Sequence, residues 1–173
     1  MPATADALSA VFKAYDVRGT VPDQIDEDLA RAVGGAFVQV TDAAGTGVVV
    51  GHDMRPSSPG MARAFAEGAA AAGADVTLIG LASTDQLYFA SGALGLPGAM
   101  FTASHNPAQY NGIKMCRAYA VPLGMETGLA DAVREAARPV PPAEHTRLIG
   151  TAPDGAREVG RRGHLRVLPS PES

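Results

Sequence analysis

The sequence predicts an α/β sandwich with a mostly parallel mixed sheet, and three observations lead to this fold class. Short β-branched runs alternate along the chain with longer segments whose apolar residues recur at helical spacing. The order strand, helix, strand, helix, strand is typical of parallel strands joined by crossover helices. The chain has 173 residues, 46% of them hydrophobic, which suffices for one domain of ordinary size with its own core.

The first helix and strand are expected before residue 52. Apolar residues recur along one helical face from Ile25 through Phe37, which predicts a helix over 25–40. Acidic residues at 26–28 lie in its first turn, where the helix dipole favours negative charge. Residues 46–51, Thr-Gly-Val-Val-Val-Gly, form a continuous β-branched run, so we expect a strand that is buried on both faces.

The same unit is expected twice more. Ser57 or Ser58 can cap the second helix, which should end at Gly73. Ser83 or Thr84 can cap the third. The remaining expected elements are strands over 75–80, 98–103 and 113–116 and helices ending near 94 and running over 126–138.

Composition excludes several classes of function. The net charge is −4 and there is no basic run, which argues against a nucleic-acid partner. No apolar stretch approaches the length of about 20 residues that spans a bilayer, so no membrane partner is expected. Cys116 is the one cysteine, which excludes an internal disulfide and, without a secretory leader, predicts the cytoplasm. Burial as a small hydrophobe is its expected role.

Ser104 is the first candidate for chemistry. It follows the strand expected at 98–103, and ligands of parallel sheets bind beyond the carboxyl ends of the strands. A serine there can act as a nucleophile or carry a phosphate, or it can belong to a polar turn that bonds only to backbone. Spacing alone leaves both readings open. A Ser-His hydrolase is disfavoured, because Gly-x-Ser-x-Gly is absent around Ser104.

Three motifs resemble those of one family. Residues 102–107 read Thr-Ala-Ser-His-Asn-Pro and 110–114 read Tyr-Asn-Gly-Ile-Lys, which is similar to the active-site serine loop of the α-D-phosphohexomutases, the family of phosphomannomutase and phosphoglucomutase. Residues 12–19, Phe-Lys-Ala-Tyr-Asp-Val-Arg-Gly, and residues 50–58 resemble two further family segments in the same order. The resemblance covers about 11–149 and implies domain I of that family, a three-layer α/β/α sandwich.

The resemblance implies a phosphoryl-transfer mechanism. Ser104 would rest as phosphoserine with Mg²⁺ bound through its phosphoryl group, and would exchange that group with hexose 1- or 6-phosphates through a bisphosphate. A glucose 1,6-bisphosphate-type activator is also implied. Such transfer needs positioning and charge neutralisation more than covalent chemistry.

The resemblance also assigns roles to five other residues. His105 and Lys114 would assist proton transfer or contact the phosphate. Tyr15 and Arg18 would face the active-site cleft, where a guanidinium suits phosphate. Asn106 would hold the loop in shape.

Each role has a structural alternative. His105 could be a surface loop histidine, Lys114 a solvated lysine and Tyr15 a packing residue, while Arg18 could form an ion pair with Asp16 or Asp23. Residues 52–58, which contain His-Asp and two serines, suggest a catalytic dyad. We expect instead a structural loop and helix cap, with Arg55 contacting the Ser104 loop.

The resemblance ends near residue 149. No run here resembles the family's metal-binding, sugar-recognition or distal phosphate loops, so we expect a truncated or frame-shifted member that is nearly inactive alone. A deliberate short form, or a non-catalytic module that binds a partner or a phosphosugar through the interdomain face, is the alternative. Residues 1–149 are the predicted catalytic-serine domain. Residues 139–142 are read as a linker, and the Gly- and Pro-rich residues 150–173 are expected to be a disordered tail.

Overall fold

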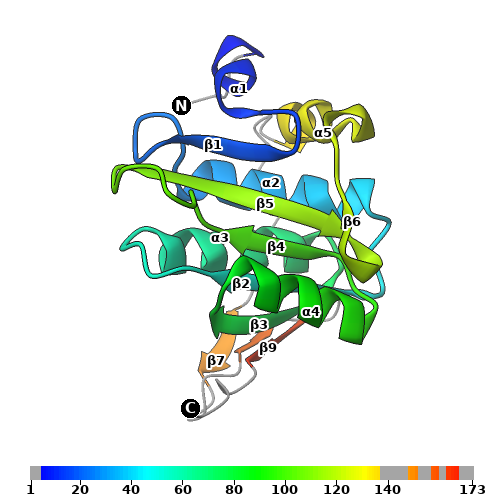
Figure 1. Cartoon of the computed structure of the whole chain (residues 1–173). Coiled ribbons are helices and arrows are strands. Elements are labelled where there is room, and N and C mark those ends of the chain that lie inside the picture. Colours follow the sequence, from blue (N-terminus) through cyan, green and yellow to red (C-terminus); the bar gives the residue numbers. More distant parts are fainter. Residues whose placement is uncertain (1–4, 137–147, 152–156, 160–162, 168–173) are drawn as a thin grey trace.

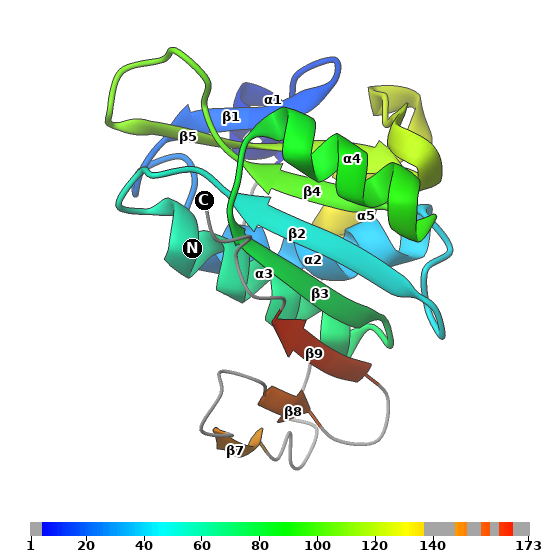
Figure 2. The same cartoon turned by 60° about the horizontal axis from the view of Figure 1, so that its bottom comes forward.

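Helices cover both faces of one sheet (Figures 1 and 2). The computed structural model describes residues 5–136, 148–151, 157–159 and 163–167. Helices α2 (Glu27–Val40) and α3 (Ser58–Ala71) lie on one face, and α4 (Thr84–Leu94) lies on the other. The predicted three-layer α/β/α sandwich is therefore confirmed.

The described strands form one mixed sheet in the order β1-β5-β4-β2-β3-β9-β8-β7, with β6 paired to β5. Parallel pairing is confined to the path β4-β2-β3-β9, and the other pairs are antiparallel. The strands are β1 (Asp16–Thr20), β2 (Gly47–His52), β3 (Asp75–Leu81), β4 (Gly98–Phe101), β5 (Tyr110–Arg117), β6 (Val121–Pro122), β7 (Leu148–Thr151), β8 (Arg157–Val159) and β9 (Gly163–Val167).

The return from β4 to β5 explains why the sheet is less parallel than the sequence predicted. Only residues 102–109 separate the two strands, and a connection this short can join antiparallel strands but not parallel ones. Strand β5 also begins at Tyr110, earlier than the expected 113, because residues 110–112 pair with β1. The candidate serine therefore lies in a tight return at the edge of the parallel part of the sheet.

The central strands are buried on both faces, as their continuous apolar runs predicted. Val48 and Val50 belong to the main core beneath α2 and α3, whereas Val49 packs with Leu87 and Met100 beneath α4. Phe65 of α3 has ring contacts with Phe37 and Phe101, with centroid distances of 5.5 Å.

Helices α2 and α3 approach each other at two glycines. A Cβ on Gly34 would lie 2.1 Å from the carbonyl oxygen of Phe65, and one on Gly68 would lie 1.9 Å from that of Arg31. These distances are shorter than van der Waals contact, so the close helix pairing depends on both glycines.

The helix ends follow the sequence signals with one exception. Ser83 caps α4 in a capping box with Gln86, and α3 ends just before Gly73, which has φ of 99°. Ser57 occupies the N-cap position of α3 but makes no side-chain cap hydrogen bond. Its hydroxyl and that of Ser58 are used instead by a buried network described below.

The ends of the described chain differ from expectation. A helix α1 (Ala5–Val11) precedes β1, and the predicted 126–138 helix begins later, as α5 (Leu129–Ala136), after a 3₁₀ turn η2 (Met125–Thr127). A second 3₁₀ turn, η1 (Ala118–Ala120), follows β5. The predicted linker at 139–142 lies outside the described residues.

The tail was expected to be disordered over 150–173. Where the structure describes this part of the chain it forms strands, and β9 pairs with β3 through Val76 and Leu165. The rest of the tail is outside the described residues, and the domain boundary at 149 stays a prediction. Among the helices of the described ranges, none combines the length and apolar character needed to cross a membrane.

Candidate functional site

The serine loop, residues 102–109, joins β4 to β5. Ser104 and His105 are exposed, and Asn106 is half-buried. Ser104 has φ of 54°, a left-handed conformation that is costly for a residue with a Cβ. Its backbone N–H donates to Thr102 Oγ1 at 3.0 Å. The loop thus holds the serine in a strained backbone conformation on the surface.

Arg55 binds the backbone of the serine loop through hydrogen bonds from its guanidinium. Its Nη1 donates to the carbonyl oxygens of Pro107 at 2.8 Å and Tyr110 at 2.9 Å. Its Nη2 donates to those of Ser104 at 2.9 Å and Asn106 at 2.7 Å. The contact between Arg55 and the Ser104 loop predicted from the sequence is therefore confirmed, and it is made entirely to backbone.

Asp53 orients this arginine. Its Oδ2 lies 3.3 Å from Arg55 Nε, and its Oδ1 accepts the Arg55 backbone N–H at 3.0 Å and the Ser58 hydroxyl at 2.6 Å. Burial acts to raise the pKa of Asp53, but hydrogen bonds from Ser58, the Arg55 backbone and Thr102, together with the Arg55 charge, lower it overall. The carboxylate therefore stays ionised beside the guanidinium.

Asn111 completes this support. It is fully buried in β5, where its Nδ2 donates to the hydroxyls of Ser57 at 2.8 Å and Ser58 at 3.0 Å. Its Oδ1 accepts the Gly112 N–H at 2.8 Å. Asn111 was expected in the polar loop rather than in a strand, and burial is compatible with its polarity because both ends of the amide are bonded.

Within residues 52–58, for which the sequence predicted a structural loop and helix cap, His52 ends β2, residues 53–57 form the loop and Ser58 begins α3. His52 Nδ1 lies 2.9 Å from the carbonyl oxygen of Asp53, so the ring contacts backbone. Ser57 and Ser58 take part in the buried network instead of providing a side-chain helix cap.

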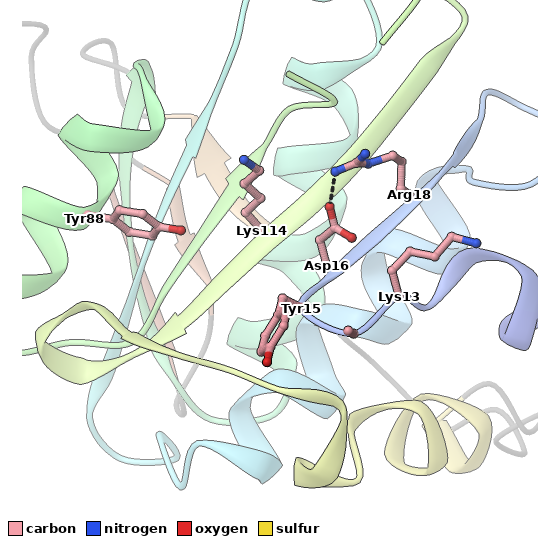
Figure 3. Close-up of a pocket in the computed structure, with 7 residues that line it drawn as sticks. Lys13, Tyr15, Asp16, Arg18, Tyr88 and Lys114 are labelled. Atoms are coloured by element: carbon pink, nitrogen blue, oxygen red, sulfur yellow. Dashed lines mark hydrogen bonds and ion pairs between the residues drawn. The ribbon is translucent and has the colours of Figure 1, made fainter. Parts of the chain in front are cut away.

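A cationic pocket of about 360 Å³ lies beside β1 and β5 (Figure 3). In Figure 3, Lys114 lies between Tyr88 of α4 and the Arg18–Asp16 pair of β1. The residues that line the pocket are Lys13, Ala14, Tyr15, Asp16, Arg18, Tyr88 and Lys114. The pocket brings together three of the predicted site residues, Tyr15, Arg18 and Lys114, and does not include Ser104, His105 or Asn106 in its lining.

Strand register explains why these side chains meet. Asp16 of β1 pairs with Lys114 of β5, which on its other side pairs with Met100 of β4. Met100 packs under α4, so Lys114 is on the face of the sheet that α4 covers. Val17 and Ile113, one residue along, belong to the opposite core.

The ion pair of Arg18 with Asp16, one of the alternatives considered from the sequence, is confirmed, whereas its phosphate-binding role stays a prediction. Arg18 forms this ion pair through Nη2, and it also lines the pocket. Its Nε is buried and has no hydrogen-bond partner among the residues that the structure describes. A buried donor left in this state is costly unless a ligand accepts from it.

Sequence reasoning missed the pocket residues Lys13 and Tyr88. Tyr88 is 37% exposed on α4, and partial burial, followed by the charges of Cys116 and Asp85, raises the pKa of its hydroxyl. Its position in a helix about 26 residues before Lys114 gives no local signal of a shared pocket. Lys13 lies within the motif at 12–19, which was the signal available for it.

Neither the cationic pocket nor the serine loop forms a metal cage. Across residues 5–136 and the three short described strands, no group of three or more His, Cys, Asp and Glu side chains is placed to hold a metal ion. The described residues therefore do not fit a resident Mg²⁺ by themselves. The expected ion stays a proposal that concerns the phosphoryl group on Ser104.

Comparison with known proteins identifies related domains. Residues 9–138 match the model of the phosphoglucomutase/phosphomannomutase α/β/α domain I. The chain is 44% identical over 149 residues to phosphohexose mutases of Xanthomonas campestris pv. campestris, covering 82% of this chain and 33% of theirs. It is 42% identical over 142 residues to a phosphomannomutase of Escherichia coli, covering 79% of this chain and 31% of that protein.

A shorter relative and a solved structure show similarity to the same family. A Klebsiella pneumoniae phosphomannomutase is 42% identical over 142 residues, covering 79% of this chain and 89% of that protein. A crystal structure of a phosphoglucomutase/phosphomannomutase family protein from Burkholderia thailandensis superposes with a TM-score of 0.70 and 33% identity, over 91% of this chain and 32% of that one. The chain thus spans about a third of the Xanthomonas and E. coli relatives. It belongs to the phosphoglucomutase/phosphomannomutase family and contains the family's α/β/α domain I.

Proposed function

We propose that this domain carries a phosphoryl group on Ser104 and exchanges it with hexose 1- and 6-phosphates. The observation that carries the proposal is the serine loop itself. An exposed serine has a strained left-handed conformation on a loop whose backbone is bonded to a largely buried guanidinium. Strain that the surrounding structure maintains is typical of functional positions.

In the proposed reaction, phosphorylated Ser104 donates its phosphoryl group to a hydroxyl of the hexose monophosphate. The bond between Ser104 Oγ and phosphorus breaks, a new bond from the sugar oxygen to phosphorus forms, and the sugar hydroxyl proton passes to Ser104 Oγ. The bisphosphate reorients, Oγ attacks its other phosphorus, the bond from that phosphorus to the sugar oxygen breaks, and the serine proton passes to that sugar oxygen. The serine is thereby phosphorylated again and the isomeric monophosphate is released, so phosphorus and protons balance over the cycle.

The cationic pocket supports a role for the other predicted residues. Lys114 and Arg18 bring two positive charges to one pocket, and Arg18 Nε has no partner within the described part of the chain. We propose that they contact the phosphate of the sugar, with Tyr15 at the pocket wall. His105, exposed beside Ser104, is proposed to assist proton transfer. Asn106 is proposed to shape the loop, and the bond from Arg55 to its backbone carbonyl supports this proposal.

Mass spectrometry of the intact chain tests the carrier role. The purified protein is incubated with glucose 1,6-bisphosphate, with and without Mg²⁺, and its mass is followed. We expect one phosphoryl adduct that fragmentation places at residue 104 and that Ser104→Ala abolishes. An adduct of unchanged amount in Ser104→Ala would refute the carrier role.

Carrying a phosphoryl group on Ser104 does not by itself imply that the chain catalyses complete mutase turnover. The sequence has no run resembling the family's sugar-recognition and distal phosphate loops. We therefore propose that the 173-residue chain alone has little or no mutase activity on glucose 1-phosphate or mannose 1-phosphate. Turnover equal to that of a longer relative would contradict this proposal. The cytoplasmic location remains part of the proposed function.

A second candidate function is a non-catalytic interaction module. Several large apolar side chains on and beside α4 are exposed, among them Phe89 at 77%, Leu81 at 62% and Leu94 at 47%. Such a module would associate through this face. Its size in solution, measured by light scattering, separates the two: a monomer that acquires the Ser104 adduct favours the carrier role.

A further inference from the structure

We infer that Arg55 is a positioning residue for phosphoryl transfer at Ser104, acting only through the backbone of the serine loop. This inference rests on the proposed function. It concerns a residue that lies outside the cationic pocket and that has no contact with Ser104 except at the backbone carbonyl.

Every nitrogen of the Arg55 guanidinium has a partner inside the protein: Nη1 and Nη2 hydrogen-bond to backbone carbonyls, and Nε forms an ion pair with Asp53. A guanidinium has five N–H donors in a planar fork. Nε faces Asp53, the two donors on Nη1 reach Pro107 and Tyr110, and the two on Nη2 reach Ser104 and Asn106. The side chain is 12% exposed. Arg55 therefore has no donor left for a substrate phosphate.

The bonds set the electrostatics of the loop. Four carbonyl oxygens from one short return point toward a single, largely buried cation. A carbonyl oxygen that turned outward beside Ser104 would repel an anionic phosphoryl group there. By drawing these oxygens inward, Arg55 leaves the exposed side of the loop free of them.

The same bonds maintain the strained conformation of Ser104. The carbonyl of Ser104 is fixed by Arg55, and its N–H is fixed by Thr102 Oγ1. Both peptide groups that flank the left-handed residue are therefore held. Without Arg55 the residue would relax toward a more common conformation, and Oγ would move from its reactive position.

Lysine cannot replace this arrangement. Its ammonium keeps the positive charge but has three donors at one point and cannot reach four carbonyls spread across a loop. Arg55→Lys therefore separates geometry from charge. Arg31→Lys is the matched control, because Arg31 pairs with Asp28 and Glu67 on the surface of α2, with 43% of its side chain exposed.

The experiment measures the rate of phosphoryl uptake from glucose 1,6-bisphosphate as a function of its concentration, for the wild type, Arg55→Lys and Arg31→Lys. We expect the limiting rate to fall at least about tenfold in Arg55→Lys, with the half-saturating concentration within about twofold of the wild type. Arg31→Lys should match the wild type. A weaker half-saturation with an unchanged limiting rate would overturn the inference, because it would make Arg55 a binding residue.

Hydrogen–deuterium exchange of the same proteins, without substrate, is the second measurement. Amides in residues 104–110 should exchange at least about tenfold faster in Arg55→Lys, while those of α2 and α3 remain protected. Unchanged exchange in the loop would also overturn the inference. If the wild type acquires no phosphoryl group, the proposed function fails, and exchange alone then decides whether Arg55 holds the loop.

Discussion

The serine loop and the cationic pocket are neighbours on β5 but are built in opposite ways. At the serine loop, Arg55 donates four hydrogen bonds to backbone carbonyls and pairs through Nε with Asp53, whose pKa is lowered by several hydrogen bonds and by the Arg55 charge. In the pocket, Arg18 pairs with Asp16 but keeps a buried Nε without a partner in the described structure. One arginine completes a scaffold, whereas the other keeps a buried donor that has no partner among the described residues.

The difference shows that an arginine's role can be told from its unused donors. The residue that stabilises the backbone should matter for folding and for the rate of a chemical step. The residue with an unused donor should matter for ligand binding and little for folding. Six substitutions at five positions, taken in four groups, test this contrast, and all are compared by the free energy of unfolding in urea.

Gly112→Ala should have the largest effect because it disturbs both regions together. A Cβ at Gly112 would lie 2.4 Å from the carbonyl oxygen of Val17 in β1 and 3.1 Å from that of Thr102 in the serine loop. We expect a loss of about 3 kcal/mol in the free energy of unfolding. Gly92→Ala in α4, where no atom lies within 4 Å, is the control and should be neutral or stabilising by up to about 1 kcal/mol.

Asp53→Asn tests the scaffold through pH. Because the folded pKa of Asp53 is lowered below its ordinary value of 3.8, its ionised form stabilises the fold above that pH, and this contribution is lost as the pH falls through the lowered value. The free energy of unfolding of the variant should be lower by about 2 kcal/mol at pH 6, and it should depend less on pH between 5 and 3. Asp131→Asn, whose exposed ion pair with Arg134 is on the surface, should change stability by less than about 0.5 kcal/mol. An unchanged acid dependence in Asp53→Asn would contradict the assignment.

Ser104→Gly and Ser104→Ala measure the strain in the loop. Both remove the hydroxyl, but only glycine adopts φ near 54° without steric cost. The glycine variant should therefore be more stable than the alanine variant by about 1 kcal/mol. Ala32→Gly, in the interior of helix α2, is the control. There alanine should be more stable than glycine, so this substitution should be destabilising. Equal stability of the two Ser104 variants would mean that the strain is absent in solution.

Arg18→Gln and Lys114→Gln should have the smallest effect on stability. Neither residue supports the backbone as Arg55 does, so we expect changes within about 0.5 kcal/mol. Binding of glucose 1-phosphate, followed by NMR titration, should weaken several-fold in each variant. A loss of stability as large as that of Asp53→Asn, with unchanged binding, would remove the contrast between the two regions.

Local spacing was enough to predict most of the framework. The apolar stripe from Ile25 predicted α2, the continuous run at 46–51 predicted a strand buried on both faces, and Ser83 with Gln86 formed the expected cap. Burial of Cys116 was also predicted, and burial raises the pKa of its thiol. These features depend on residues within one or two turns of each other, so period and capping chemistry reveal them.

The candidate site also combines features that the local sequence predicted with features that it could not predict. Sequence pattern and family motifs predicted that Ser104 follows a buried strand and that Arg55 contacts its loop. They could not predict which Arg55 donors bind which loop carbonyls, because the pairing of β2 with β4 and of β4 with β5 brings Arg55 and Tyr110 together. The antiparallel return of β5 and the burial of Asn111 are likewise consequences of register. Hydrogen bonds are short and directional, so only the three-dimensional path of the chain decides which polar groups are satisfied and which remain for a ligand.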